Sequence, residues 1–168
     1  HLEDEVGRKL QYIARISAAS TPFERLELIR PGDDQSRMVL RLKEKLGQIE
    51  EATGVENILV FTPDRTSLLD LDPAAPIGVR YPLEQFTPAF LAQLEAGQSV
   101  STQGYLREGG RIFISAYAPV QDLEGRLFAV VGVDAGAGEL AIIEALRTRL
   151  YWVTFAAIAL ACLLALFF

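Results

Sequence analysis

Residues 111–134 read RIFISAYAPVQDLEGRLFAVVGVD, and this stretch decides the fold that the sequence predicts. Apolar and β-branched residues dominate both of its halves, which is typical of strands that pack against a hydrophobic core. Between the halves, residues 122–125 form a short segment that begins with Asp and ends with Gly, which favours a tight turn. The stretch therefore predicts an antiparallel hairpin, with strands over residues 111–120 and 127–135.

Three further strands are predicted before this hairpin. Short runs rich in β-branched and aromatic residues, bounded by Pro, Gly and Asp, indicate strands over residues 55–62, 67–71 and 99–106. Gly109-Gly110 then favours a hairpin turn between the last of these strands and the quoted stretch. Strands joined by tight turns form an antiparallel sheet.

Helices are predicted from apolar residues at spacings of three and four. The apolar positions are Leu2, Val6, Leu10, Ile13 and Ile16 in a helix over residues 2–19, and Met38, Leu42, Leu46 and Ile49 in a second helix that stops at Gly54. Thr87-Pro88 fits the start of a third, short helix that stops at Gly97. Helices packed on an antiparallel sheet define an α+β domain.

The sequence after residue 135 predicts a helix that enters a lipid bilayer. Gly136 and Gly138 end the last strand, and a helix begins at Glu139 with no stop signal before Leu150. Residues 150–168, LYWVTFAAIALACLLALFF, contain no charge and approach the roughly 20 residues that a membrane-spanning helix needs. We therefore expect a folded domain over residues 1–138 and, over residues 139–168, an exit helix whose membrane segment (150–168) is truncated.

Composition and motifs argue against several functions. The net charge of −6 is unfavourable for a nucleic-acid partner. The only histidine is His1 and the only cysteine is Cys162 in the apolar run, so we expect neither a Ser-His or Cys-His nucleophile pair nor a disulfide. Residues 136–141, GAGELA, fit a dinucleotide-binding pattern, but the helix that follows enters the bilayer, so we interpret these glycines as a strand-to-helix joint. We expect no enzyme activity and no cofactor in this chain.

Asp134 is a polar residue at the end of an apolar strand, residues 128–134. Alternation places it on the same face as Gly132, which leaves room for a ligand to approach. The neighbouring strands carry further candidates on one face: Arg111, Phe113, Ser115 and Tyr117, and Tyr105 one strand further out. Two interpretations stay open. Either these groups form a cup for a small molecule, or the aromatic residues are core and Asp134 caps the exit helix.

Asp64, Asp70 and Asp72 lie around the second predicted strand. Carboxylates suit a hard cation, but the Gly and Glu spacing of a calcium loop is absent. We therefore expect these aspartates to be solvated turn residues, and we expect no metal site.

The stretch 111–134 resembles the closing hairpin of CACHE domains, which are PAS-like periplasmic sensors. In that family a small-Pro-Val/Ile step leads through Asp-x-x-Gly to an apolar strand that ends in Val-Asp. Residues 118–120 (APV), 122–125 (DLEG) and 133–134 (VD) match this pattern. Residues 51–64, EATGVENILVFTPD, are similar to the family's joint between a helix and the first strand, and the order of elements matches over essentially the whole part before the apolar run.

The resemblance implies a single CACHE unit, with a long N-terminal helix, a five-stranded antiparallel sheet and a ligand cup on one sheet face. The aspartate at the position of Asp134 often binds the ligand's amine in the amino-acid sensors of the family. Those sensors also carry an Arg-x-Trp-Tyr element, of which this chain keeps only Arg80-Tyr81-Pro82, so amino-acid recognition is less favoured, although Arg80 suits an anion. The candidate ligand-binding residues are Asp134, Tyr105, Tyr117, Ser115, Phe113, Arg80 and Tyr81.

The resemblance also implies the setting of the domain. It predicts a receptor in the bacterial inner membrane whose sensor domain faces the periplasm and binds a small metabolite such as an organic acid, an amino acid or an amine. We expect a sensor histidine kinase; a diguanylate cyclase, a chemoreceptor and a membrane-anchored protein-interaction module are the alternatives. The apolar stripe of residues 2–19 is wide enough to pack on the sheet and against a second copy, so we expect a homodimer.

Overall fold

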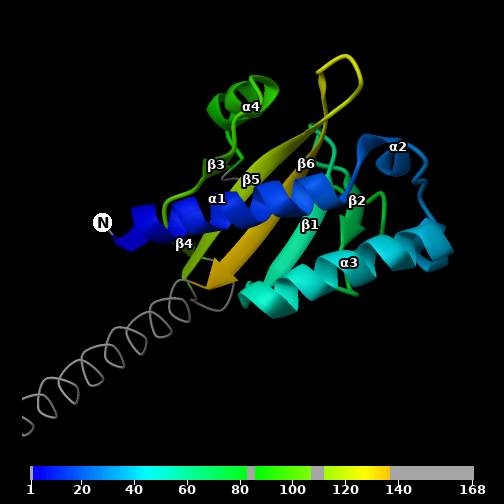
Figure 1. Ribbon diagram of the computed structural model, residues 1–168, viewed down its shortest axis with the longest axis horizontal. Helices are drawn as coiled ribbons and strands as arrows, with labels where there is room; N and C mark the ends of the chain where they lie inside the picture. Colours follow the sequence, from blue (N-terminus) through cyan, green and yellow to red (C-terminus); the bar gives the residue numbers. More distant parts are fainter. Residues whose placement is uncertain (1, 83–85, 107–111, 137–168) are drawn as a thin grey trace, which may run out of the picture.

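An antiparallel sheet forms the centre of the structure, and two long helices lie across one of its faces (Figure 1). The computed structural model describes residues 2–82, 86–106 and 112–136. The strands are β1 (Asn57–Phe61), β2 (Ser67–Asp70), β3 (Val100–Ser101), β4 (Tyr105–Leu106), β5 (Ile112–Gln121) and β6 (Leu127–Gly136). They lie in the order β2-β1-β6-β5-β3, with β4 also paired to β5. The α+β class and the path of five antiparallel strands expected from the sequence are confirmed.

The β5–β6 hairpin forms as the sequence predicts. Its register runs from Phe113↔Gly136 to Gln121↔Leu127. In the turn, Gly125 has a φ of 78° and its N–H donates to the Asp122 carbonyl oxygen at 3.0 Å. Glycine adopts this left-handed conformation without a steric penalty. Strand β6 also pairs with β1, so it is buried between two neighbours, which explains its long apolar run.

The strand predicted over residues 99–106 is two short strands, β3 and β4. The interruption lies at Thr102, whose side chain is bonded to Ser115 of β5. The Thr102 Oγ1 accepts a hydrogen bond from the Ser115 N–H at 2.9 Å, so a side chain takes the place of a backbone acceptor in the ladder. Hydroxyl side chains compete with backbone pairing in this way.

Helices α1 (Leu2–Ser20) and α3 (Arg37–Thr53) cover one face of the sheet and enclose the larger apolar cluster with it. Val6, Leu10 and Ile13 of α1 are buried, as their spacing predicts. Ile16 differs from the prediction because its side chain is 39% exposed. The helical period brings Ser17, rather than Ile16, onto the face that meets the sheet.

The helix ends follow the predicted signals. The Ser36 hydroxyl accepts a hydrogen bond from the Val39 N–H at 3.3 Å at the start of α3, and Gly54 ends the helix with a φ of 70°. Thr87 caps α4 (Pro88–Glu95) in the same way, through the Phe90 N–H. Two single-turn elements, α2 (Phe23–Leu26) and the 3-10 turn η1 (Asp33–Gln35), were not predicted because they are too short to show a period.

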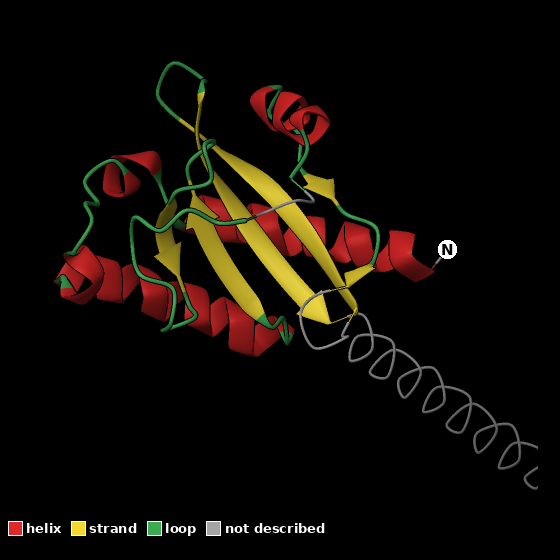
Figure 2. Cartoon of the chain, turned by 180° about the vertical axis from the view of Figure 1, so that it is seen from behind, coloured by secondary structure: helices red, strands yellow, loops and turns green. Residues whose placement is uncertain are grey.

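No long helix of the described residues covers the other face of the sheet (Figure 2). A smaller apolar cluster lies there. It is built from residues of the sheet, of α4 and of the segment before α4: Leu59, Phe61, Leu94, Val100, Tyr117 and Val130, with Tyr81, Phe86, Phe90 and Leu127 packed against them. This face holds the candidate site.

Within residues 2–82, 86–106 and 112–136, no helix is long and apolar enough to cross a membrane. The predicted Gly109-Gly110 turn, the exit helix from Glu139 and the membrane segment 150–168 lie outside the described residues.

Candidate ligand-binding site

A row of polar side chains crosses three adjacent strands on the face without long helices. Asp134 of β6 lies directly opposite Asn57 of β1 and Ser115 of β5. Alternation along the strands places all three on the same face, since Ile58, Ile114 and Val133 beside them belong to the cluster on the helical face. Asp134 is 3% exposed and Ser115 is fully buried, and the Ser115 hydroxyl donates a hydrogen bond to Asp134 Oδ1.

Asp70, at the end of β2, extends this row by one strand. Its Oδ1 accepts hydrogen bonds from Asn57 Nδ2 and from the Asp72 N–H, both at 2.9 Å. Its Oδ2 accepts a hydrogen bond from the Tyr81 hydroxyl. The expectation that Asp70 is a solvated turn residue is therefore wrong, because Asp70 is only 3% exposed and is the last residue of the strand. A buried carboxylate needs such donors to offset its desolvation.

Tyr81 links the sheet to the segment that precedes α4. Its hydroxyl lies 3.0 Å from Ser67 Oγ in addition to its bond with Asp70, and its ring meets the Phe61 ring edge-on at 6.0 Å between centroids. Burial and the hydrogen bond to Asp70 raise the pKa of Tyr81. Burial also raises the pKa of Asp70, although the bonds from Tyr81 and Asn57 oppose this shift. The hydroxyl of Tyr81 thus anchors the segment before α4 to Asp70 and Ser67 of the sheet.

The centre of the same face is filled by aromatic side chains. Tyr117 meets the rings of Phe61 and Phe86 at 6.0 and 5.5 Å between centroids. The room that the sequence predicted beside Gly132 is occupied, because a Cβ at this glycine would lie 3.2 Å from Leu59 Cδ2 and 3.2 Å from Tyr117 Cε1. The space that Gly132 leaves is therefore filled by the side chains of Leu59 and Tyr117.

A depression of about 350 Å³ lies at the end of the face where the polar row is found. It is lined by α3, by the start of β1 and the residue before it, by the segment after β2 and by β5. The lining residues are Glu50, Glu56, Asn57, Leu71, Asp72, Pro73 and Phe113. Glu50 is half-buried, and its pKa is raised by desolvation and by the negative charge of Asp70. The depression joins polar groups to an apolar wall, which is the usual make-up of a small-molecule site.

The predicted site residues divide into three groups. Asp134, Ser115 and Phe113 lie together at the polar end of the face. Tyr117 and Tyr81 belong to the aromatic cluster next to it. Arg80 lies at the opposite end of the β1–β2 hairpin, where its Nε donates to the Asp64 carbonyl oxygen at 3.1 Å.

The remaining candidate, Tyr105, is described only by its backbone, which pairs with Phe113. Its side chain lies outside the described residues. Asn57 and Asp70 were missed by the sequence interpretation, although both are polar residues at the end of an otherwise apolar strand run. That conflict between residue type and strand position was the available signal.

A larger and more open groove, of about 850 Å³, runs between α1, residues 97–99 and the β5–β6 hairpin. Exposed side chains such as Arg15, Gln98 and Leu123 line it, and no buried polar group is among its lining residues. The depression differs because it borders the buried polar row through Asn57, whose side chain donates a hydrogen bond to Asp70.

Among the described residues, no three His, Cys, Asp or Glu side chains lie close enough together to bind a metal ion. Asp64 is an exposed turn residue as expected, and the Thr62 hydroxyl that donates to it lowers its pKa. Asp72 is exposed too.

The sheet order and the long N-terminal helix define a PAS-like α+β fold. Among solved structures, the chain is similar to the sensor domain of Escherichia coli DcuS, with a TM-score of 0.60 and 14% identity over 83% of this chain and 95% of that one. It is also similar to the sensory domain of the Campylobacter jejuni chemoreceptor Tlp3 with isoleucine bound, with a TM-score of 0.50 and 14% identity over 83% of this chain and 62% of that one. The fold implied by the resemblance to CACHE domains is thereby confirmed.

No protein-family model and no curated protein matches the chain. At these identities the two structural neighbours establish the fold alone.

Proposed function

We propose that this chain is the extracytoplasmic ligand-sensing domain of a bacterial transmembrane receptor and that it binds a small metabolite at the polar end of the sheet. The observation that carries the proposal is the row Asp70-Asn57-Asp134-Ser115, which lies beside a depression in a fold shared with two solved sensor domains. Buried polar groups that converge beside a cavity are costly for stability alone and are typical of binding sites.

The strand that carries Asp134 also offers a route for the signal. Strand β6 ends at Gly136, and the sequence predicts that the chain continues from there through an exit helix into the membrane. A ligand that contacts the polar row changes the preferred position of β6, and it shifts the receptor toward the arrangement that it binds more tightly. Glycines 136 and 138 act as the joint between strand and helix.

The rest of the receptor follows from the sequence prediction. The sensor domain faces the periplasm, the chain is anchored in the inner membrane, and the output is a histidine kinase, with a diguanylate cyclase or a chemoreceptor as alternatives. A homodimer forms through the outer face of α1, where Tyr12 is 64% exposed and Ile16 is 39% exposed.

A thermal-shift screen of the 168-residue chain in detergent tests the proposal. The library contains amino acids, amines and short carboxylic acids. A ligand at 100 times its dissociation constant adds about 2.7 kcal/mol of stability. Asp134→Asn keeps an acceptor for the Ser115 hydroxyl, so the protein stays folded but loses most of the ligand's stabilisation. Glu124→Gln, at the hairpin tip, is the matched control and keeps it.

A protein-interaction module without a small ligand is the second candidate function. The filled aromatic centre around Tyr117 and Gly132 favours it. A screen in which no compound stabilises the chain, while Asp134→Asn unfolds it, supports this candidate and contradicts the sensor proposal.

A further inference from the structure

We propose that strand β3 couples helix α1 to the face of the sheet that holds the candidate site, which is called the site face below. The link consists of two neighbouring residues, Val100 and Ser101, whose side chains lie on opposite faces of the sheet. Its role in signalling rests on the proposed function, whereas the link itself can be tested without a ligand.

Val100 belongs to the aromatic cluster on the site face. It is buried in that cluster with Leu94 of α4 and Tyr117 of β5, and it pairs with Tyr117 in the sheet. Tyr81 packs against the same cluster and donates a hydrogen bond to Asp70 of the polar row. Packed side chains and hydrogen bonds of this kind carry energetic coupling between sites. A change in the polar row therefore has a continuous route to Val100.

Ser101, the next residue, meets the opposite side of the sheet. Its partner in β5, Ala116, belongs to the apolar cluster that α1 and α3 cover. Gln11 Nε2 of α1 donates a hydrogen bond to Ser101 Oγ at 2.9 Å. Because successive side chains of a strand alternate between the two faces, one step along β3 joins the site face to α1.

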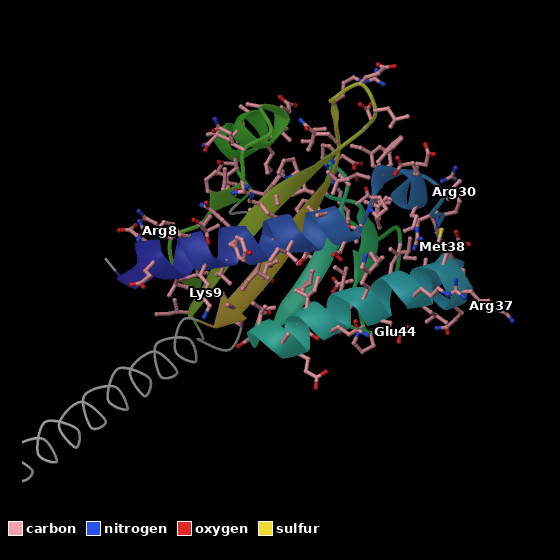
Figure 3. All side chains as sticks on the ribbon, viewed as in Figure 1. Arg8, Lys9, Arg30, Arg37, Met38 and Glu44 are labelled. Carbon is pink, nitrogen blue, oxygen red and sulfur yellow. The ribbon has the colours of Figure 1, made fainter. Side chains whose placement is uncertain are left out.

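Helix α1 lies directly against Ser101 at Gly7. A Cβ at this glycine would lie only 2.7 Å from Ser101 Oγ, so a larger residue would force the helix and the strand apart. Arg8 and Lys9, the charged residues of the same turn, are exposed (Figure 3). A displacement of Ser101 therefore acts on the helix backbone, because no long side chain separates the two at this point.

Strand β3 is short enough to move. It has two residues and lies at the edge of the sheet, in contact with α4. Gly97, with a φ of 78°, precedes it, and at Thr102 a side chain takes the place of a backbone acceptor. Segments with few backbone hydrogen bonds open or shift at a lower free energy than central strands do. We therefore expect β3 to follow a change at α4 more readily than β5 or β6 does.

The consequence for the receptor concerns the outer face of α1. The proposed dimer forms there, where Tyr12 and Ile16 are exposed. A ligand that shifts β3 therefore changes the dimer contact, and by linkage dimerisation changes the affinity for the ligand by the same factor.

Nuclear magnetic resonance of the isotope-labelled 168-residue chain in detergent tests the link without a ligand. Leu94→Ala loosens the aromatic cluster at α4, and we expect it to shift the amide signals of Ser101, Gly7 and Gln11, including the side-chain amide of Gln11. Ser101→Ala removes the acceptor of Gln11, and in this background we expect Leu94→Ala to leave the Gly7 and Gln11 signals in place. Leu69→Ala is the matched control, because Leu69 is an equally buried leucine in β2, at the opposite edge of the sheet. We expect it to leave the same signals unchanged.

Phe90→Leu is a milder change in the same cluster, and it is measured in the same way if Leu94→Ala unfolds the protein. The inference is overturned if the α1 signals do not respond to the change in the cluster, or if they respond equally in the Ser101→Ala background. It is also overturned if Leu69→Ala shifts them as far. The sensor function fails separately, when no compound of the library stabilises the chain, and a positive result here then stands as a coupling between β3 and α1 without a ligand.

Discussion

Tyr81→Phe removes one oxygen atom from the contact that holds the segment before α4 against the sheet. The substitution keeps the ring beside Phe61 and deletes the hydroxyl that donates to Asp70. Asp70 is only 3% exposed, so water replaces the lost donor poorly. A hydrogen bond to a charged group contributes roughly 1.5–3 kcal/mol. We therefore expect the variant to lose about 2 kcal/mol of stability at neutral pH.

The loss depends on pH in a defined direction. Burial raises the pKa of Asp70 above its ordinary value of 3.8, so the folded state binds a proton more readily than the unfolded chain does. The contribution of Asp70 protonation to the free energy of unfolding is fully present below the pKa of Asp70 in the unfolded chain. It is lost as pH rises through the pKa of Asp70 in the folded protein. The Tyr81 bond favours the charged carboxylate and lowers its pKa, so the variant's folded pKa is higher still. The cost of Tyr81→Phe is therefore largest at neutral pH and shrinks as Asp70 is protonated in acid.

Circular dichroism melts and urea titrations of the 168-residue chain at pH 7 and near pH 4 measure this difference. A loss of about 2 kcal/mol corresponds to a fall in Tm of roughly 4–8 °C for a domain of this size. Leu123→Ala is the control, because Leu123 is 84% exposed in the turn of the β5–β6 hairpin and its side chain contributes little to stability. An equal loss at both pH values, or a loss no greater than that of Leu123→Ala, would refute the reasoning.

Two further predictions concern packing and assembly. Gly132→Ala puts a Cβ 3.2 Å from both Leu59 and Tyr117, so we expect a loss of about 1–3 kcal/mol in urea unfolding, and an unchanged midpoint would show that the packing around Gly132 is looser than described. Tyr12→Glu places a charge on the outer face of α1 and should convert the dimer to a monomer in analytical ultracentrifugation. Leu40→Glu, at a 46% exposed position of α3, should leave the dimer intact. The same mass for the unsubstituted chain, Tyr12→Glu and Leu40→Glu would contradict assembly through α1.

The fold was predictable because its signals are local. The stripe of Val6, Leu10 and Ile13, the stop at Gly54 and the turn at Gly125 each depend on a few neighbouring residues. The break between β3 and β4 was not predictable in the same way. It arises from a side-chain bond between Thr102 and Ser115, which are far apart in the sequence.

The site was predictable only in part, for the same reason. Alternation along one hairpin is enough to place Ser115 beside Asp134. Predicting the hydrogen bond between Asn57 and Asp70 requires the register of β1 against β2, and the sequence pattern does not determine that register. The space beside Gly132 depends on how Leu59 and Tyr117 orient their side chains, so the sequence shows that a gap is possible but does not show what fills it.

The central claim is that a small molecule binds at the polar end of the sheet, and amide chemical shifts of the isotope-labelled chain test it most directly. The strongest stabilising compound from the thermal-shift screen is titrated into the protein in detergent. We expect the largest shift changes at Asn57 and Phe113, which line the depression, and at Asp134, which pairs with Asn57 in the sheet. Changes confined to the groove between α1 and the β5–β6 hairpin, at Gln98 and Gln121, would contradict it.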